Sequence, residues 1–95
     1  MRIKLSPQLN GTSLTVRKAG NTLTLNGEVF DFSFMTEGST LPRLAIGSDW
    51  FADDVHMENG ELRVTLLFPI PGKPTTAQAF PEDLVDVPDG EVVLP

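Results

Sequence analysis

The chain contains no cysteine, so no disulfide can stabilise its fold. A secreted β-domain of this size often carries disulfides, and their absence favours a reducing cytoplasm. No apolar run approaches the roughly 18 residues that cross a bilayer. Arg2 and Lys4 place charges inside what would have to be the apolar part of a signal peptide. We therefore expect no export and no membrane span.

Residues for catalysis are also scarce. His56 is the only histidine, and neither a nucleophile elbow nor a Gly-rich phosphate-binding pattern is present. Asp54 and Glu58 flank His56 at alternate positions, and three such groups are able to hold a divalent cation or perform acid–base chemistry. The alternative is the solvated face of a hairpin with His56 opposite Arg63. We favour this alternative and predict no enzyme activity, no metal and no cofactor.

Positive charge is missing from the end of the chain. The last sixteen residues contain no lysine or arginine but five carboxylates, Glu82, Asp83, Asp86, Asp89 and Glu91. Every charged residue before Glu28 is basic. These are either two solvated faces or complementary surfaces, with the acidic end against the basic start within one chain or head to tail between subunits. The basic residues are few and lack neighbouring aromatic residues, so we expect no nucleic-acid partner.

Three Asn-Gly pairs are the clearest signal that is present. Asn26-Gly27 and Asn59-Gly60 lie between runs of alternating apolar and polar residues, which predicts type I′ hairpin turns. Asn10-Gly11 predicts a further turn. In the first half, strands are expected at residues 2–6, ended by Ser6-Pro7, and at 13–18, 22–26 and 28–33. They predict a four-stranded meander with one apolar face: Leu14, Val16 opposite Leu25, Leu23 opposite Phe30, Phe32 and Phe34.

In the second half, residues 35–47 read as a loop with one helical turn after Pro42. A hairpin is expected between residues 50–57 and 61–68, with Val55 opposite Val64 and Met57 opposite Leu62. Residues 69–95 are rich in proline and predict acidic edge strands or an arm, closed by a short hairpin at Asp89-Gly90. The 95 residues form one domain, with a hairpin core over residues 1–68. We expect an all-β fold, a small antiparallel sandwich or partly open barrel with an extended Pro-rich C-terminal segment.

Trp50 and Phe51 are adjacent, so on a strand their side chains point to opposite sides. If Phe51 joins the core, Trp50 points outward. An outward Trp50 either lies under the Pro-rich tail or anchors a partner.

Several segments resemble small uncharacterised proteins encoded by tailed bacteriophages and prophages. The similar stretches are residues 3–8, 23–32, 37–42, 50–51, 59–69 and 92–95, which are distributed along nearly the whole chain. Such proteins are encoded near tail and other structural genes, and the resemblance implies a role in the virion or in its assembly. The shared motifs are turns and core positions, so the resemblance assigns no functional residue.

We therefore predict a non-enzymatic phage structural or assembly module that binds a protein partner or associates with itself as a homo-oligomer. Trp50 is the expected anchor, and the carboxylates of Glu82, Asp83 and Asp86 are expected to steer the partner. The alternative is a small acidic inhibitor or regulator of a host protein. The expected location is the bacterial cytoplasm, with incorporation into a virion left open.

Overall fold

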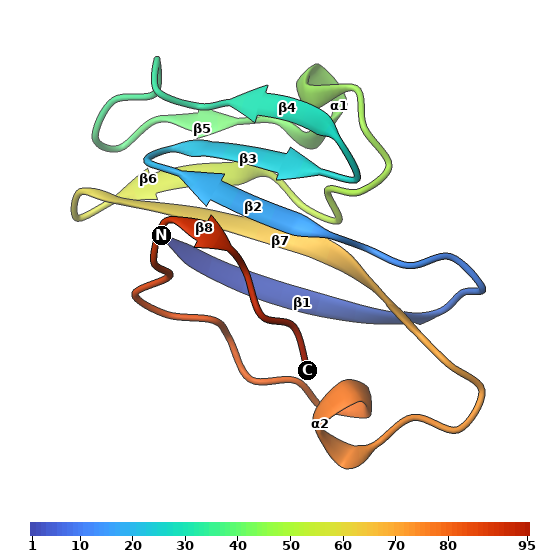
Figure 1. Cartoon of the computed structure of the whole chain (residues 1–95). Helices are drawn as coiled ribbons and strands as arrows, with labels where there is room; N and C mark the ends of the chain where they lie inside the picture. The colour runs from blue at the N-terminus through green and yellow to red at the C-terminus, as the bar shows by residue number, and fades with distance from the viewer.

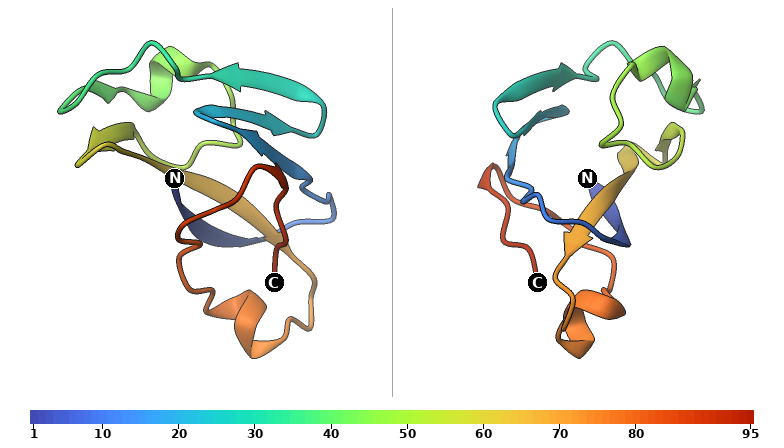
Figure 2. Two further views of the ribbon diagram at one scale, coloured as in Figure 1. Left: turned by 60° about the vertical axis from the view of Figure 1, so that its left-hand side comes forward. Right: turned by 90° about the vertical axis from the view of Figure 1, so that its right-hand side faces the viewer.

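The computed structural model describes all of residues 1–95. The chain is mostly β, with eight strands in two four-stranded sheets (Figures 1 and 2). Sheet A has the order β1 (Arg2–Leu9), β7 (Glu61–Ile70), β6 (Val55–Glu58) and β5 (Thr40–Leu41). Sheet B has the order β4 (Glu28–Asp31), β3 (Thr22–Leu25), β2 (Val16–Ala19) and β8 (Gly90–Glu91). The arrangement is compatible with an all-β sandwich.

Tight turns join the strands of the predicted hairpins. Asn26 and Asn59 have φ angles of 48° and 54°, and the glycine after each is also positive, as type I′ turns require. Three predicted register pairs are confirmed: Val16 with Leu25, Leu23 with Phe30, and Met57 with Leu62.

The first strand lies in sheet A, so the prediction of a meander that includes it is wrong. β1 pairs in parallel with β7, and Ile3 lies opposite Val64. Asn10 and Gly11 lie in a turn, as predicted, but this turn does not join two paired strands and neither residue has a positive φ. The Asn10 side chain accepts hydrogen bonds of 2.9 Å from the amide and the hydroxyl of Thr12. This local turn lets the chain cross from sheet A to sheet B.

β1 also continues beyond Ser6-Pro7, where the sequence predicts its end. Ile3 exchanges two backbone hydrogen bonds of 2.8 Å with Leu84 on the outer side of β1. Alternate residues of a strand direct their amides to the same side, so the missing N–H of Pro7 also falls on this outer edge. The proline therefore removes no bond to β7, and the strand extends to Leu9.

Phe34 does not continue the buried face of sheet B. Phe32 is 2% exposed, as predicted, whereas Phe34 is 66% exposed, so its predicted burial is wrong. β4 ends at Asp31, whose carboxylate accepts a hydrogen bond from the amide of Ser33 (2.9 Å). The backbone turns there, and the alternation of side chains is lost.

The predicted unbroken strand over residues 50–57 is also wrong. Phe51 lies opposite Leu66, although continuing the β6 register would place it opposite Phe68. The extra residues before Val55 form a bulge. The carboxylate of Asp54 in this bulge accepts a hydrogen bond from the amide of Arg43 (2.8 Å), at the start of α1 (Arg43–Ile46). This helix confirms the predicted helical turn after Pro42.

The second helix, α2 (Thr76–Ala79), has no counterpart among the predicted elements. Thr75 and Gln78 form a capping box, in which the Thr75 hydroxyl accepts from the Gln78 amide and the Gln78 side chain accepts from the Thr75 amide. The spacing of these two residues is a start signal that can be read in the sequence.

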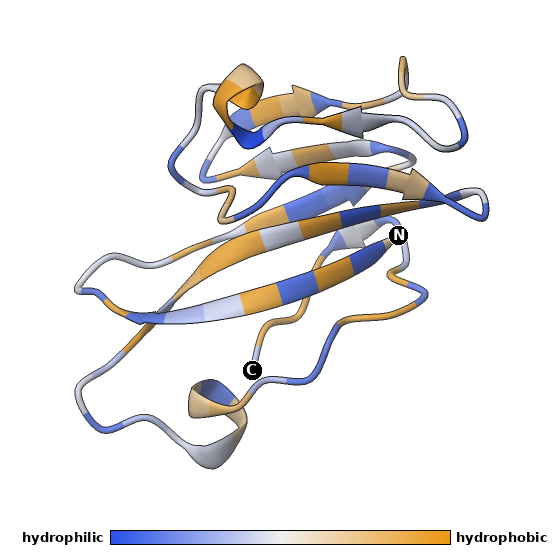
Figure 3. Cartoon of the chain, turned by 180° about the vertical axis from the view of Figure 1, so that it is seen from behind, coloured by the Kyte–Doolittle hydropathy of each residue, from blue (hydrophilic) through white to orange (hydrophobic).

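One core fills the space between the sheets. It contains seventeen buried residues, all of them apolar. Phe51 lies fully buried, with the rings of Phe30 and Phe32 edge-on to it at 5.0 and 5.6 Å. Hydropathy alternates along β1 and β7, so each strand gives one face to this core (Figure 3).

Candidate functional site

The C-terminal segment, residues 81–95, bends at Asp86 (Figure 1). Its first arm, residues 81–85, and its second arm, residues 87–95, contact different sheets. Leu84 in the first arm bridges to Ile3 at the edge of β1. In the second arm β8 pairs with β2, and the amide of Val92 donates to the carbonyl of Val16 (2.8 Å). The predicted hairpin at Asp89-Gly90 is wrong, because the partner of β8 is β2 and not the preceding residues.

Ion pairs join the acidic segment to the basic start of the same chain. Arg2 Nε lies 3.0 Å from the carboxylate of Asp83, and Lys18 Nζ lies 2.6 Å from that of Asp89. Of the two complementary arrangements considered from the sequence, the structure has the one within a single chain.

Asp89 ties the second arm to the β2–β3 turn. Its carboxylate accepts from the Lys18 ammonium and from the amide of Gly20 (3.0 Å). The hydrogen bond from Lys18 is the main cause that lowers the pKa of Asp89 below its usual 3.8, and the Gly20 amide and the charge of Lys18 add to it. The Lys18 side chain is only 11% exposed, so the carboxylate also serves to pair a largely buried cation.

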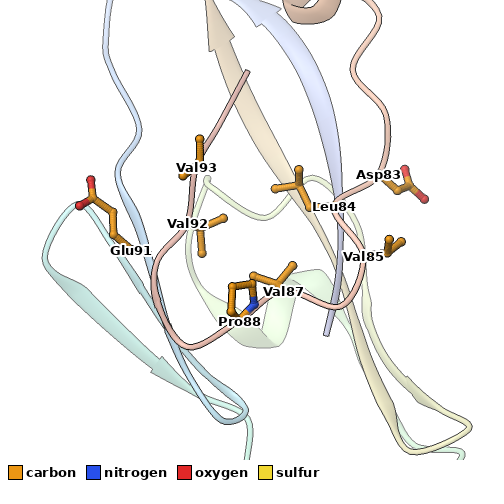
Figure 4. A pocket seen from close by; sticks show the side chains of 8 residues that line it. All are labelled: Asp83, Leu84, Val85, Val87, Pro88, Glu91, Val92 and Val93. Atoms are coloured by element: carbon orange, nitrogen blue, oxygen red, sulfur yellow. The ribbon is translucent and has the colours of Figure 1, made fainter.

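The two arms enclose an open apolar groove of about 360 Å³. Figure 4 shows Leu84 and Val92 projecting toward each other across it, while the carboxylates of Asp83 and Glu91 point away on opposite sides. The other lining residues are Val85, Val87, Pro88 and Val93. Val87 and Val92 are buried in the core, whereas Val85 and Val93 are 52% and 86% exposed. We call this feature the C-terminal groove.

The predicted interface residues occupy two separate places. Glu82, Asp83 and Asp86 lie in the C-terminal segment, where Glu82 and Asp86 are exposed and Asp83 is paired with Arg2. Asp86 has a φ of 51°, a left-handed conformation at the bend between the arms. Trp50 is half-buried against the core, and its carbonyl accepts a hydrogen bond from the Leu67 amide on the β6 side of β7. The C-terminal segment lies elsewhere, with its first arm beyond β1 and its second arm beyond β2. Trp50 does not line the C-terminal groove.

The structure gives Asp54, His56 and Glu58 separate partners. Asp54 accepts from the Arg43 amide, His56 Nδ1 lies 3.0 Å from the Thr40 hydroxyl, and Glu58 lies 3.8 Å from Arg63. His56 is opposite Arg63 in the β6–β7 ladder, as the hairpin alternative predicts. No group of three or more histidine, cysteine or acidic residues is arranged to hold a metal ion.

The acidic residues of the segment were predicted as interface residues, but the C-terminal groove was not predicted. The feature of the sequence that indicates this groove is a set of valines among the prolines and carboxylates: Val85, Val87, Val92 and Val93. The burial of Val87 and Val92 could not be inferred, because no turn motif fixes how residues 69–95 pair with the first two strands.

Comparisons with protein-family models, with curated proteins and with solved structures gave no match. Neither helix has the length and apolar character needed to span a bilayer.

Proposed function

We propose that this chain is a non-enzymatic module that binds a protein partner through the C-terminal groove. The observation that carries the proposal is an apolar surface left open between the two arms of the C-terminal segment. Exposed apolar surface next to a formed core is typical of protein interfaces. Val85 and Val93 provide such surface on the two arms, at 52% and 86% exposure.

The chemistry of the groove favours a protein over a small molecule. A small-molecule site usually adds a few convergent polar groups to an apolar pocket. Here the two lining carboxylates, Asp83 and Glu91, point away from the groove (Figure 4). The groove therefore offers contact area to an apolar side chain and few groups with which to orient a substrate.

The resemblance to phage-encoded proteins gives the proposed context, which is a structural or assembly role in a tailed phage. The expected partner is then a virion protein or a second copy of the chain. The exposed carboxylates of Glu82 and Asp86 also suit a small acidic inhibitor of a host protein. The identity of the captured partner separates these two functions.

Site-specific crosslinking tests the proposal. A photo-reactive amino acid replaces Val85 or Val93 in the groove, and Val29 on β4 as a control of comparable exposure, 63%. The variants are produced in bacteria during prophage induction and irradiated, and adducts are identified by mass spectrometry. We expect one defined adduct from the groove positions and none from Val29.

A virion protein in that adduct supports the assembly role, and a host enzyme supports the inhibitor. Equal adducts from all three positions, or none from the groove, would overturn the proposal. Trp50→Ala is tested in the same assay, because the sequence predicts an anchor there. Loss of the adduct in that variant would extend the interface to Trp50.

A further inference from the structure

We infer that the partner enters the C-terminal groove as an extended strand that adds to the outer edge of β8, with apolar residues alternating with basic ones. This inference rests on the proposed function and specifies its mode of recognition. Strand addition to an exposed sheet edge is a common way to bind a peptide, since main-chain bonds give affinity and side-chain pockets give specificity.

The backbone of the second arm supplies the free edge. β8 is the last strand of sheet B, and β2 is its only partner. The amide of Val92 points to β2, where it bonds to Val16. Because alternate residues face opposite sides, the N–H and C=O groups of Glu91 and Val93 point outward. Apart from the pairing of β8 with β2, neither residue takes part in a backbone hydrogen bond.

The first arm gives the second wall. Leu84 uses its N–H and C=O on Ile3, so its side chain shares the inner face with that buried residue. Leu84 and Val92 thus face the space between the arms, as Figure 4 shows. A strand added to β8 lies beside this space, and its inward side chains fill it. The apolar lining selects valine, leucine or isoleucine at those alternate positions.

The charges around the groove select the outward residues. Asp83 and Asp89 are neutralised by Arg2 and Lys18, and Arg17 lies opposite Glu91. Glu82 and Asp86 are exposed and form no salt bridge. This excess of negative charge favours lysine or arginine on the incoming strand.

A second copy of this chain suits the edge poorly. The other edge strand of sheet B is β4, which carries Glu28 and Asp31, both exposed. Pairing β4 of one copy with β8 of another would place these carboxylates near Glu91, and like charges across a strand pair are unfavourable. The inferred occupant is therefore a segment of a different protein.

A substitution at Val93 distinguishes the backbone hydrogen bonds of the β8 edge from the side-chain contacts of the C-terminal groove. Its N–H faces outward and its side chain is 86% exposed, so Val93→Pro removes a donor from the edge without removing a bond of the fold. Pro7 occupies an equivalent outward position in β1. The matched control is Val93→Ala, which shortens the side chain and keeps the N–H.

The experiment is a titration followed through the backbone amide signals of the full chain. The probe is a short blocked peptide of alternating lysine and valine, and a glutamate–valine peptide is the charge control. We expect the amides of Glu91 and Val93 to shift and to become protected from exchange. We also expect the Val93→Ala variant to bind within about threefold of the original affinity and Val93→Pro to bind about tenfold more weakly or worse.

Each other outcome overturns a stated part of the inference. Equal binding by Val93→Pro rules out strand addition and leaves the proposed function intact. Equal binding of the glutamate–valine peptide rules out selection of basic residues. Concentration-dependent shifts of the same amides without peptide make a second copy the occupant. If the peptide does not bind, the inference fails, and the proposed function fails with it only if crosslinking at Val85 and Val93 also gives no adduct.

Discussion

Glu37 illustrates how one side chain can stabilise a turn distant in the sequence. Its two carboxylate oxygens accept hydrogen bonds from the amides of Asn59 and Gly60, at 2.8 and 2.6 Å. The Gly60 amide is the larger cause of the lowered pKa of Glu37, followed by that of Asn59. The contact holds the tip of the β6–β7 hairpin against the loop that precedes β5.

We predict that Glu37→Gln lowers stability at neutral pH and that this effect diminishes as the pH falls through the folded pKa of Glu37. The folded pKa lies below the usual 4.5, so the stabilisation is complete above that pH and is lost as pH falls through the folded value. Urea unfolding of both proteins at pH 7 and at a series of lower pH values measures the difference. Glu28→Gln, at an exposed position on β4, is the control. A difference that persists in acid would contradict this role.

At the same scale, the sequence predicts the chemistry of single residues better than their contacts. The acidic character of Glu82 and Asp86 is evident from composition, and both are exposed. The contact of Glu37 with a turn more than twenty positions away is not evident from composition, because only the folded loop brings Glu37 next to that turn.

Among the elements, the two Asn-Gly hairpins differ in the hydrogen bonds of the asparagine side chain, and this difference is not evident from their sequences. The Asn26 side chain accepts from the amide and hydroxyl of Thr15, at 2.7 and 3.1 Å, and donates to the carbonyl of Ser13 (3.0 Å). It thereby fixes the chain that enters β2. The Asn59 side chain makes no such bond, although its φ is also positive.

We therefore predict that Asn26→Ala is more destabilising than Asn59→Ala by about 1–2 kcal/mol, since both lose the left-handed preference of asparagine but only the first loses side-chain hydrogen bonds. Urea unfolding of the two variants measures this difference. Replacement of each residue by glycine, which tolerates positive φ, isolates the hydrogen-bond contribution. Equal losses in the alanine variants would show that the Asn26 contacts add nothing.

The elements that the sequence predicts correctly are those set by local turns. A two-residue turn fixes the register of its hairpin, and the registers of β2 with β3 and of β6 with β7 follow from it. The parallel pairing of β1 with β7 has no such local signal, because the partners are about sixty residues apart. The bulge between Phe51 and Val55 is likewise set by packing across the sheet and not by alternation.

For the whole molecule, the proline-rich end is the part whose structure is predicted least well from composition. Six of the eight prolines lie from Pro69 onward, which predicts edge strands or an arm but does not indicate which of these residues are buried. Yet Val87 and Val92 belong to the same buried cluster as Ile3 and Val16. Prolines exclude central strands but allow an edge, and the segment uses short edge pairings to carry these valines into the core.

This packing makes the C-terminal segment part of one cooperative unit, and adjacent valines test it. Val92 is 8% exposed and Val93 is 86% exposed. We predict that Val92→Ala lowers the free energy of unfolding by about 1–2 kcal/mol, because it removes buried methyl groups, and that Val93→Ala changes it by less than about 0.5 kcal/mol. Unfolding followed by Trp50 fluorescence and by far-ultraviolet circular dichroism should give coincident single transitions that shift together for Val92→Ala. An arm that folds independently would leave the Trp50 transition unchanged in that variant, since Trp50 lies on the β6 side of β7, away from the C-terminal groove.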